Sequence, residues 1–188
     1  MSDSDKKSIE ELTDEFHQLM GHAIANWAEV EAYLFKILRA ALGVSSQRAA
    51  MVFSRAGQLE SKRQLVGALL ATRLPTRANN GGAEHADSRK WKGITSDVST
   101  LLKTRNMIAH QPMDPHLDWE EELDGGVGKT EFWYEITSSD YQRAKDGGPG
   151  DTLNAEDLRK HIGDVSHLKN RLHDFYAHTL SKYVRLVP

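Results

Sequence analysis

Apolar residues recur at every third or fourth position in the first part of the chain. This spacing places them on one face of an α-helix. It predicts one long amphipathic helix from Ile9 to Gly43, because a glycine after the last periodic residue commonly ends a helix. Residues 1–8 are polar and are predicted to be a disordered N-terminus. The stripe consists of Ile9, Leu12, Phe16, Met20, Ile24, Trp27, Val30, Leu34, Leu38 and Ala41.

The same periodicity predicts three further helices. Proline cannot continue a helix, so prolines set the ends of the second and third of the four. Asn154 and Asp157 resemble a capping box, in which side chains bond the free N–H groups at a helix start. The predicted helices run from Ser45 or Ser46 to Leu74, from near Ser88 to the residues before Pro112 and Pro115, and from Asn154 to Tyr183.

Between the third and fourth helices the periodicity changes to alternation, which is typical of β-strands. Leu117 and Trp119 alternate with acidic residues, Phe132 and Ile136 alternate with polar ones, and residues 124–126 supply turn chemistry between them. This pattern predicts a β-hairpin over about 116–137. The predicted fold class is mostly all-α: an antiparallel four-helix up-and-down bundle with a β-hairpin insertion between helices three and four. One domain of residues 9–188 is expected.

Composition and charge restrict the class of protein. The 188 residues include no cysteine, which excludes disulfides and cysteine-based metal sites. No apolar run is long enough to span a membrane and no signal peptide is visible, so we expect a cytoplasmic protein without a membrane partner. The net charge of -3 hides an asymmetry: residues 45–110 hold eleven bases and four acids, and residues 111–151 hold three bases and eleven acids. The basic part favours an anionic ligand such as RNA, and ordinary solvated helix faces are the alternative.

A glycine-rich segment at residues 125–130 is similar to a phosphate-binding loop but lacks its essential features. Such a loop needs a glycine at the position of Leu123, and a helix should begin where this chain has strand periodicity. A hairpin turn explains the glycines better, and we expect no cofactor. The nine histidines show no metal-binding spacing, so no metal site is predicted.

The end of the third predicted helix carries the sequence RNMIAH at residues 105–110. Arg105 continues an apolar stripe, so its charged head must emerge into a cleft or meet an acid, for which Glu31 is the candidate. Asn106 and His110 are helical neighbours, so the amide can orient the imidazole. Histidine can take or give a proton near neutral pH, and arginine offers a planar fork to phosphate oxygens. We therefore predict Arg105, Asn106 and His110 as catalytic residues.

This motif resembles the Arg-Asn-x-Ile-Ala-His form common in the HEPN superfamily, named for nucleotide binding in higher eukaryotes and prokaryotes. Trp27 and Glu31 are similar to a first-helix pattern of many HEPN-like proteins. The resemblance implies a metal-independent endoribonuclease that cleaves RNA by 2′-hydroxyl attack. It also implies a homodimer, so that two motifs share one cleft, and a role as a toxin restrained by an antitoxin or in phage defence. The family allows four to six residues between the arginine and the histidine, so the spacing alone is weak: Arg171 and His178, with six residues between them, match it too.

Two other functions stay open at this point. One is a non-catalytic HEPN-like module that binds RNA, nucleotide or another protein as a dimeric scaffold. The other is a structural bundle in which Arg105 pairs with Glu31. The aromatic residues of the hairpin, among them Trp119 and Trp133, predict a partner surface. Under the RNA-binding readings, the predicted contacts to phosphate are Arg55, Lys62, Arg63 and Lys103.

Overall fold

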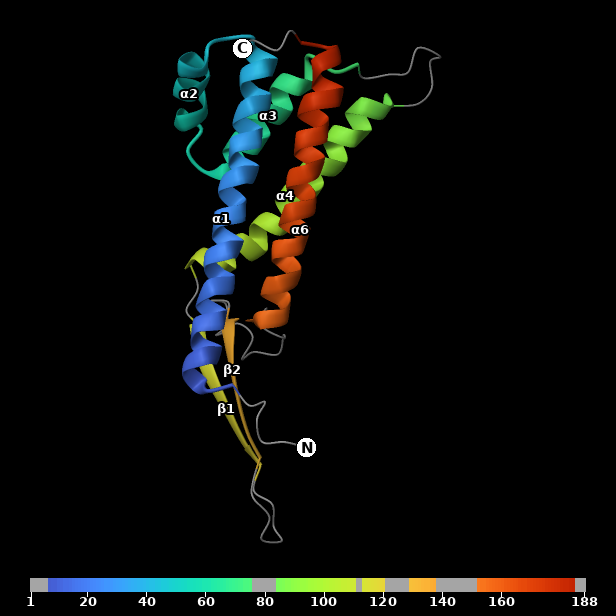
Figure 1. Cartoon of the computed structure of the whole chain (residues 1–188). Coiled ribbons are helices and arrows are strands. Elements are labelled where there is room, and N and C mark those ends of the chain that lie inside the picture. Colours follow the sequence, from blue (N-terminus) through green and yellow to red (C-terminus); the bar gives the residue numbers. More distant parts are fainter. Residues whose placement is uncertain (1–6, 76–83, 111–112, 121–128, 138–151, 185–188) are drawn as a thin grey trace, which may run out of the picture. The chain divides into compact units, whose positions relative to one another are not determined.

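The described part of the chain is mainly helical, with one small antiparallel sheet (Figure 1). A computed structural model describes residues 7–75, 84–110, 113–120, 129–137 and 152–184. The helices are α1 (Ile9–Leu42), α2 (Ser46–Arg55), α3 (Leu59–Ala71), α4 (Ala86–His110) and α6 (Ala155–Asp174), and a π-helical turn (Phe175–Thr179) and a 3₁₀ turn (Leu180–Lys182) follow α6. The strands are β1 (Met113–Glu120), β2 (Lys129–Thr137) and β3 (Thr152–Leu153).

The chain divides into two compact units, each with its own core. Unit 1 comprises Met1–Ile24 and Thr104–Ile162, and unit 2 comprises Ala25–Lys103 and Gly163–Pro188. The boundaries fall inside α1, α4 and α6, so each of these helices contributes residues to both units. The predicted predominance of helix is confirmed, and the four-helix up-and-down arrangement stays a prediction.

The core of unit 2 is built from the apolar stripes of the second half of α1, of α3, and of the parts of α4 and α6 that belong to this unit. Leu34, Leu70, Ile94 and Leu172 are completely buried there. The ring centroids of Trp91 and Phe175 lie 5.1 Å apart in a tilted arrangement. Each buried aliphatic side chain stabilises the fold by about 1.5–3 kcal/mol relative to leaving it in water.

The core of unit 1 joins the start of α1 to the sheet. Phe16 is 2% exposed, and its ring centroid lies 5.7 Å from that of Tyr134 on β2. The hydroxyl groups of Thr13 and Tyr134 form a 2.8 Å hydrogen bond. Ile136 and Leu158, both completely buried, complete the contact between β2 and the first turn of α6.

The predicted hairpin is confirmed, with longer strands than expected. β1 and β2 pair antiparallel, with Met113 opposite Ile136 at one end and Glu120 opposite Lys129 at the other. The short strand β3, which the sequence did not predict, pairs antiparallel with the end of β2 and gives the sheet order β1-β2-β3. The predicted turn at residues 124–126, and residues 1–6 of the predicted disordered N-terminus, lie outside the described residues.

The single helix predicted from Ser45 or Ser46 to Leu74 is wrong, because the structure divides it into α2 and α3. Gly57 has a φ of 69°, in the left-handed region that side chains other than glycine rarely adopt. The Gly57 N–H donates to the Ser54 carbonyl, which closes the last turn of α2. The apolar periodicity continues through this break, and for that reason it did not reveal the two helices. Gly43, with a φ of 66°, ends α1 as predicted.

The predicted capping box at the start of the last helix is confirmed. The Asn154 side chain accepts hydrogen bonds from the Glu156 and Asp157 N–H groups, and the Asp157 carboxylate accepts one from the Asn154 N–H. The predicted single helix nevertheless ends at Asp174, where the π-helical turn begins. No helix in the described residues has the length and apolar character needed to cross a membrane.

Replacing glycines at two positions should change stability in opposite directions. Gly57→Ala should lower the free energy of unfolding by about 1 kcal/mol, because alanine is strained at a positive φ. Nothing lies within 4 Å of a Cβ added at either Gly57 or Gly21, so no steric clash contributes. Gly21→Ala, inside α1, should raise the free energy of unfolding by about 0.5–1 kcal/mol. Urea denaturation of both variants measures these changes, and a Gly57→Ala protein as stable as the native chain would contradict the left-handed break.

Candidate functional site

The end of α4 presents the predicted catalytic motif in unit 1. Ile108 is 3% exposed and anchors this last turn in the core of the unit. Asn106 and His110 lie one helical turn apart, on the side of α4 away from Ile108, and both side chains are exposed. Arg105 is half-buried. This arrangement follows from the sequence, because the apolar residue of the last turn packs in the core while its polar neighbours along the helix face solvent.

Arg105 and Asn106 are joined directly. The Arg105 Nη1 group donates a 3.2 Å hydrogen bond to the Asn106 Oδ1 atom. The sequence predicted that this amide would orient the His110 imidazole, but no hydrogen bond joins Asn106 to His110 among the described residues. The amide therefore orients the guanidinium, and the imidazole faces solvent on the same side of the helix.

The acid predicted for Arg105 has a different partner. Glu31 belongs to unit 2, where its carboxylate forms an ion pair with Lys62. The Lys62 side chain is 15% exposed and the Glu31 side chain 41% exposed. Glu31 is therefore partly exposed and is already paired with a cation in its own unit. The pairing of Glu31 with Arg105 stays a prediction.

The four predicted RNA-binding residues lie in unit 2, whereas the catalytic motif lies in unit 1. Lys62 is engaged by Glu31, and its Nζ atom lies 4.9 Å from the centroid of the Phe53 ring. Arg63 forms a two-pronged ion pair with Glu60 through its Nε and Nη2 atoms. Arg55 and Lys103 are exposed, and neither forms an ion pair within the part of the chain that the structure describes. Two of the four charges are thus compensated within the protein.

The other arginine–histidine pair with a spacing that the family allows is Arg171 with His178. Arg171 forms an ion pair with Asp97, across from α6 to α4 in unit 2. Its Nη2 atom also lies close to Gly93, 3.1 Å from where a Cβ would stand. His178 is exposed in the π-helical turn that follows α6. The Arg171 guanidinium therefore links α6 to α4 and is compensated by a carboxylate.

A groove of about 440 Å³ runs beside β2 in unit 1. Phe16, Phe132, Trp133 and Tyr134 give it an aromatic lining, and its charged residues are Glu15, Glu135, Glu156 and Arg159. Three carboxylates against one guanidinium make the groove unsuitable for a polyanion such as RNA. No residue of the catalytic motif lines it.

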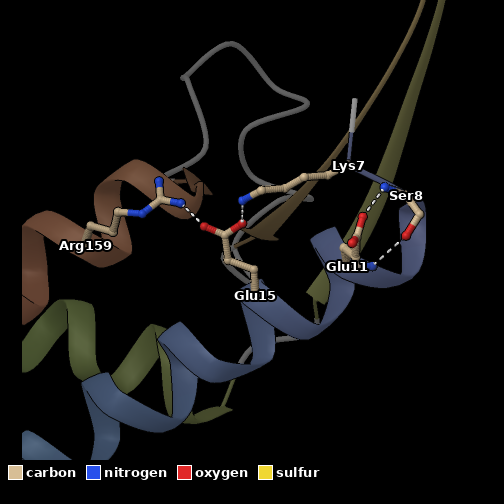
Figure 2. Close-up of polar contacts among 5 residues, drawn as sticks. All are labelled: Lys7, Ser8, Glu11, Glu15 and Arg159. Carbon is tan, nitrogen blue, oxygen red and sulfur yellow. Dashed lines mark hydrogen bonds and ion pairs between the residues drawn. The ribbon is translucent and has the colours of Figure 1, made fainter. Parts of the chain in front are cut away.

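Polar contacts at the start of α1 involve Glu15 and Arg159, two of the residues that line this groove (Figure 2). Glu15 forms ion pairs with both Lys7 and Arg159, and these hydrogen bonds hold the pKa of the Glu15 carboxyl below its ordinary value. Ser8 and Glu11 form a reciprocal capping box: the Ser8 N–H donates to Glu11, and the Glu11 N–H donates to Ser8 Oγ. The sequence signal for this cap is a serine followed three residues later by a glutamate.

A second cavity, of about 300 Å³, lies between α4 and α6 in unit 2. Its polar lining includes Asp97, Asp164 and His167. Asp97 is already paired with Arg171. In the described ranges, no three histidine or acidic side chains are grouped so that they could hold a metal ion.

No protein-family model matches this chain, and neither a curated protein nor a solved structure matches it significantly.

The pairing of Arg63 with Glu60 predicts a specific loss of stability in acid. Hydrogen bonds from Arg63 lower the pKa of Glu60 to about 2 from an ordinary value of 4.5. The stabilisation is therefore complete above pH 4.5 and disappears as the pH falls toward 2. The native chain should melt at a higher temperature than Glu60→Gln at pH 6, and this difference should shrink as the pH is lowered.

Thermal melts of both proteins between pH 2 and pH 6 measure this effect. Arg63→Gln is the matched control, since it removes the cation and should abolish the same pH dependence. A difference in melting temperature that stays constant over this range would show that the ion pair does not stabilise the fold.

Proposed function

We propose that the protein is a HEPN-like, metal-independent endoribonuclease that uses Arg105, Asn106 and His110. The observation that carries the proposal is the arrangement at the end of α4. His110 and Asn106 are exposed on one face of the helix, and the half-buried guanidinium of Arg105 is hydrogen-bonded to Asn106. A proton-transfer group and an oriented cation thus lie within two helical turns of each other.

The chemistry requires one bond to form and one to break at the same phosphorus. A base removes the proton of the 2′-hydroxyl group, whose oxygen attacks the adjacent phosphorus. The bond from phosphorus to the 5′-oxygen breaks, and that oxygen takes a proton from an acid. The products carry a 2′,3′-cyclic phosphate and a 5′-hydroxyl. His110 supplies one of the two proton transfers, and Arg105 stabilises the charge on the phosphoryl oxygens.

One histidine cannot act as acid and base in the same step. A two-fold homodimer would supply the second histidine without any further residue type, because each protomer would contribute one motif to a shared cleft. The proposal therefore includes a homodimer. The role as a toxin restrained by an antitoxin, or in phage defence, enters only through the resemblance of the RNMIAH motif to the HEPN superfamily.

Cleavage of a mixed-sequence labelled RNA in the presence of EDTA tests the proposal. The native chain should produce fragments with cyclic phosphate ends, and His110→Ala should reduce the rate by about 100-fold or more, as expected for loss of a general acid or base. Single-stranded DNA of the same sequence should stay intact, because it lacks the 2′-hydroxyl nucleophile.

His178→Ala is the matched control, since His178 is an exposed histidine in the other Arg/His pair of the chain. It should retain the native rate. Equal activity of His110→Ala and the native chain would contradict the role assigned to His110. No cleavage by a folded, dimeric native chain would leave the alternative of a non-catalytic module that binds RNA or another protein.

A further inference from the structure

Helix α2 presents apolar side chains to solvent as well as to the core. Ala49 is completely buried and Phe53 is 7% exposed, and these two residues attach α2 to unit 2. Met51 and Val52 point away from this attachment and are 60% and 42% exposed. They are adjacent, and they are two of the four large hydrophobic side chains exposed in the described residues. The core does not explain why methionine and valine occupy these positions.

The exposed apolar pair lies within a helical stripe bounded by arginines. Arg48, Met51, Val52 and Arg55 stand at positions i, i+3, i+4 and i+7, which share one face of an α-helix. We call these four residues the α2 stripe. No acidic residue occurs in α2, and neither Arg48 nor Arg55 forms an ion pair within the described part of the chain. The α2 stripe therefore combines an apolar centre with two uncompensated positive charges.

A second copy of α2 is a poor occupant for this stripe. In a two-fold symmetric contact the same surface meets itself, so the arginines of one copy would be brought close to those of the other. Four guanidinium groups without a carboxylate between them would repel one another. The charge of the α2 stripe requires carboxylates on the partner.

RNA and a membrane also fit the stripe less well than an acidic protein surface. Phosphate would engage the arginines but would leave Met51 and Val52 without apolar contacts, and the stripe offers no aromatic ring on which a base could stack. A ten-residue helix, about 15 Å long, with one methionine and one valine gives too small an apolar face for insertion at a membrane surface. Arginine and methionine are, in contrast, enriched in protein–protein interfaces.

We propose that the α2 stripe is the docking surface for an acidic amphipathic helix of another protein. Leucine-type side chains of that helix would cover Met51 and Val52, and its glutamate or aspartate side chains would pair with Arg48 and Arg55. The contact is small compared with stable protein interfaces, so its isolated affinity is expected to be about micromolar or weaker. The α2 stripe shares no residue with the motif at the end of α4, and the proposal does not depend on ribonuclease activity.

Binding of designed peptides to the full chain tests the proposal. The probe is a synthetic helical peptide with leucines at i, i+3, i+4 and i+7, flanked by glutamates. The comparison peptide has the same leucines flanked by lysines. Isothermal titration calorimetry should show binding of the glutamate peptide and at least about tenfold weaker binding of the lysine peptide, because charge complementarity selects the partner.

Charge reversal on the stripe should reverse this preference. The double variant Arg48→Glu/Arg55→Glu should bind the lysine peptide more tightly than the glutamate peptide. Ala50→Glu is the matched control: it adds a carboxylate at an exposed position of the same helix, on the face away from the stripe, and it should keep the native preference. Met51→Gln, at an exposed position, should weaken binding of the glutamate peptide without lowering the melting temperature, so the test does not depend on one variant folding.

Three results would overturn the proposal. The first is a glutamate peptide that binds no more tightly than the lysine peptide. The second is a control variant that loses as much affinity as the charge-reversed one. The third is a labelled RNA or an anionic phospholipid vesicle that binds the native chain, does not bind Arg48→Glu/Arg55→Glu, and stays bound when the glutamate peptide is added in excess; this result would assign the stripe to that ligand.

Discussion

The apolar stripe of α1 is the constraint on which both cores depend. Its first half places Phe16 and Ala23 in the core of unit 1, and its second half places Trp27, Leu34 and Leu38 in the core of unit 2. A helix of 34 residues can do this because one hydrophobic periodicity runs along its whole length. The buried apolar residues of the other elements pack in one or the other of these two cores.

This dependence explains which parts of the fold could be predicted from the sequence. Periodicity located α1 and α4, alternation located β1 and β2, and the side chains of Asn154 and Asp157 located the start of α6, because each of these signals is local. The division between α2 and α3 was missed, since apolar positions continue in phase past Gly57. The two-residue strand β3 depends on pairing with β2 and has no periodicity of its own. The π-helical turn after Asp174 likewise has no signal in the apolar periodicity.

The candidate site was predictable in its residues but not in its partners. The RNMIAH string identified Arg105, Asn106 and His110, and their spacing along a helix determined that Asn106 and His110 would share a face. Which group would meet Arg105 depends on side-chain conformations that spacing does not specify, and the structure gives it Asn106. The ion pairs of Lys62 with Glu31 and of Arg63 with Glu60 likewise compensate two charges of the basic segment, and a count of charges along the sequence does not reveal such pairs.

Gly43 and Gly57, whose backbone is in the left-handed region, have a consequence for how this protein can change over evolutionary time. They bracket α2 as a separate segment whose attachment rests on Ala49 and Phe53. Substitutions at the four stripe positions alter charge and shape on the solvent side while leaving those two attachment residues in place. Recognition at this surface can therefore diversify among descendants of the same sequence without first requiring a compensating change in the hydrophobic interior.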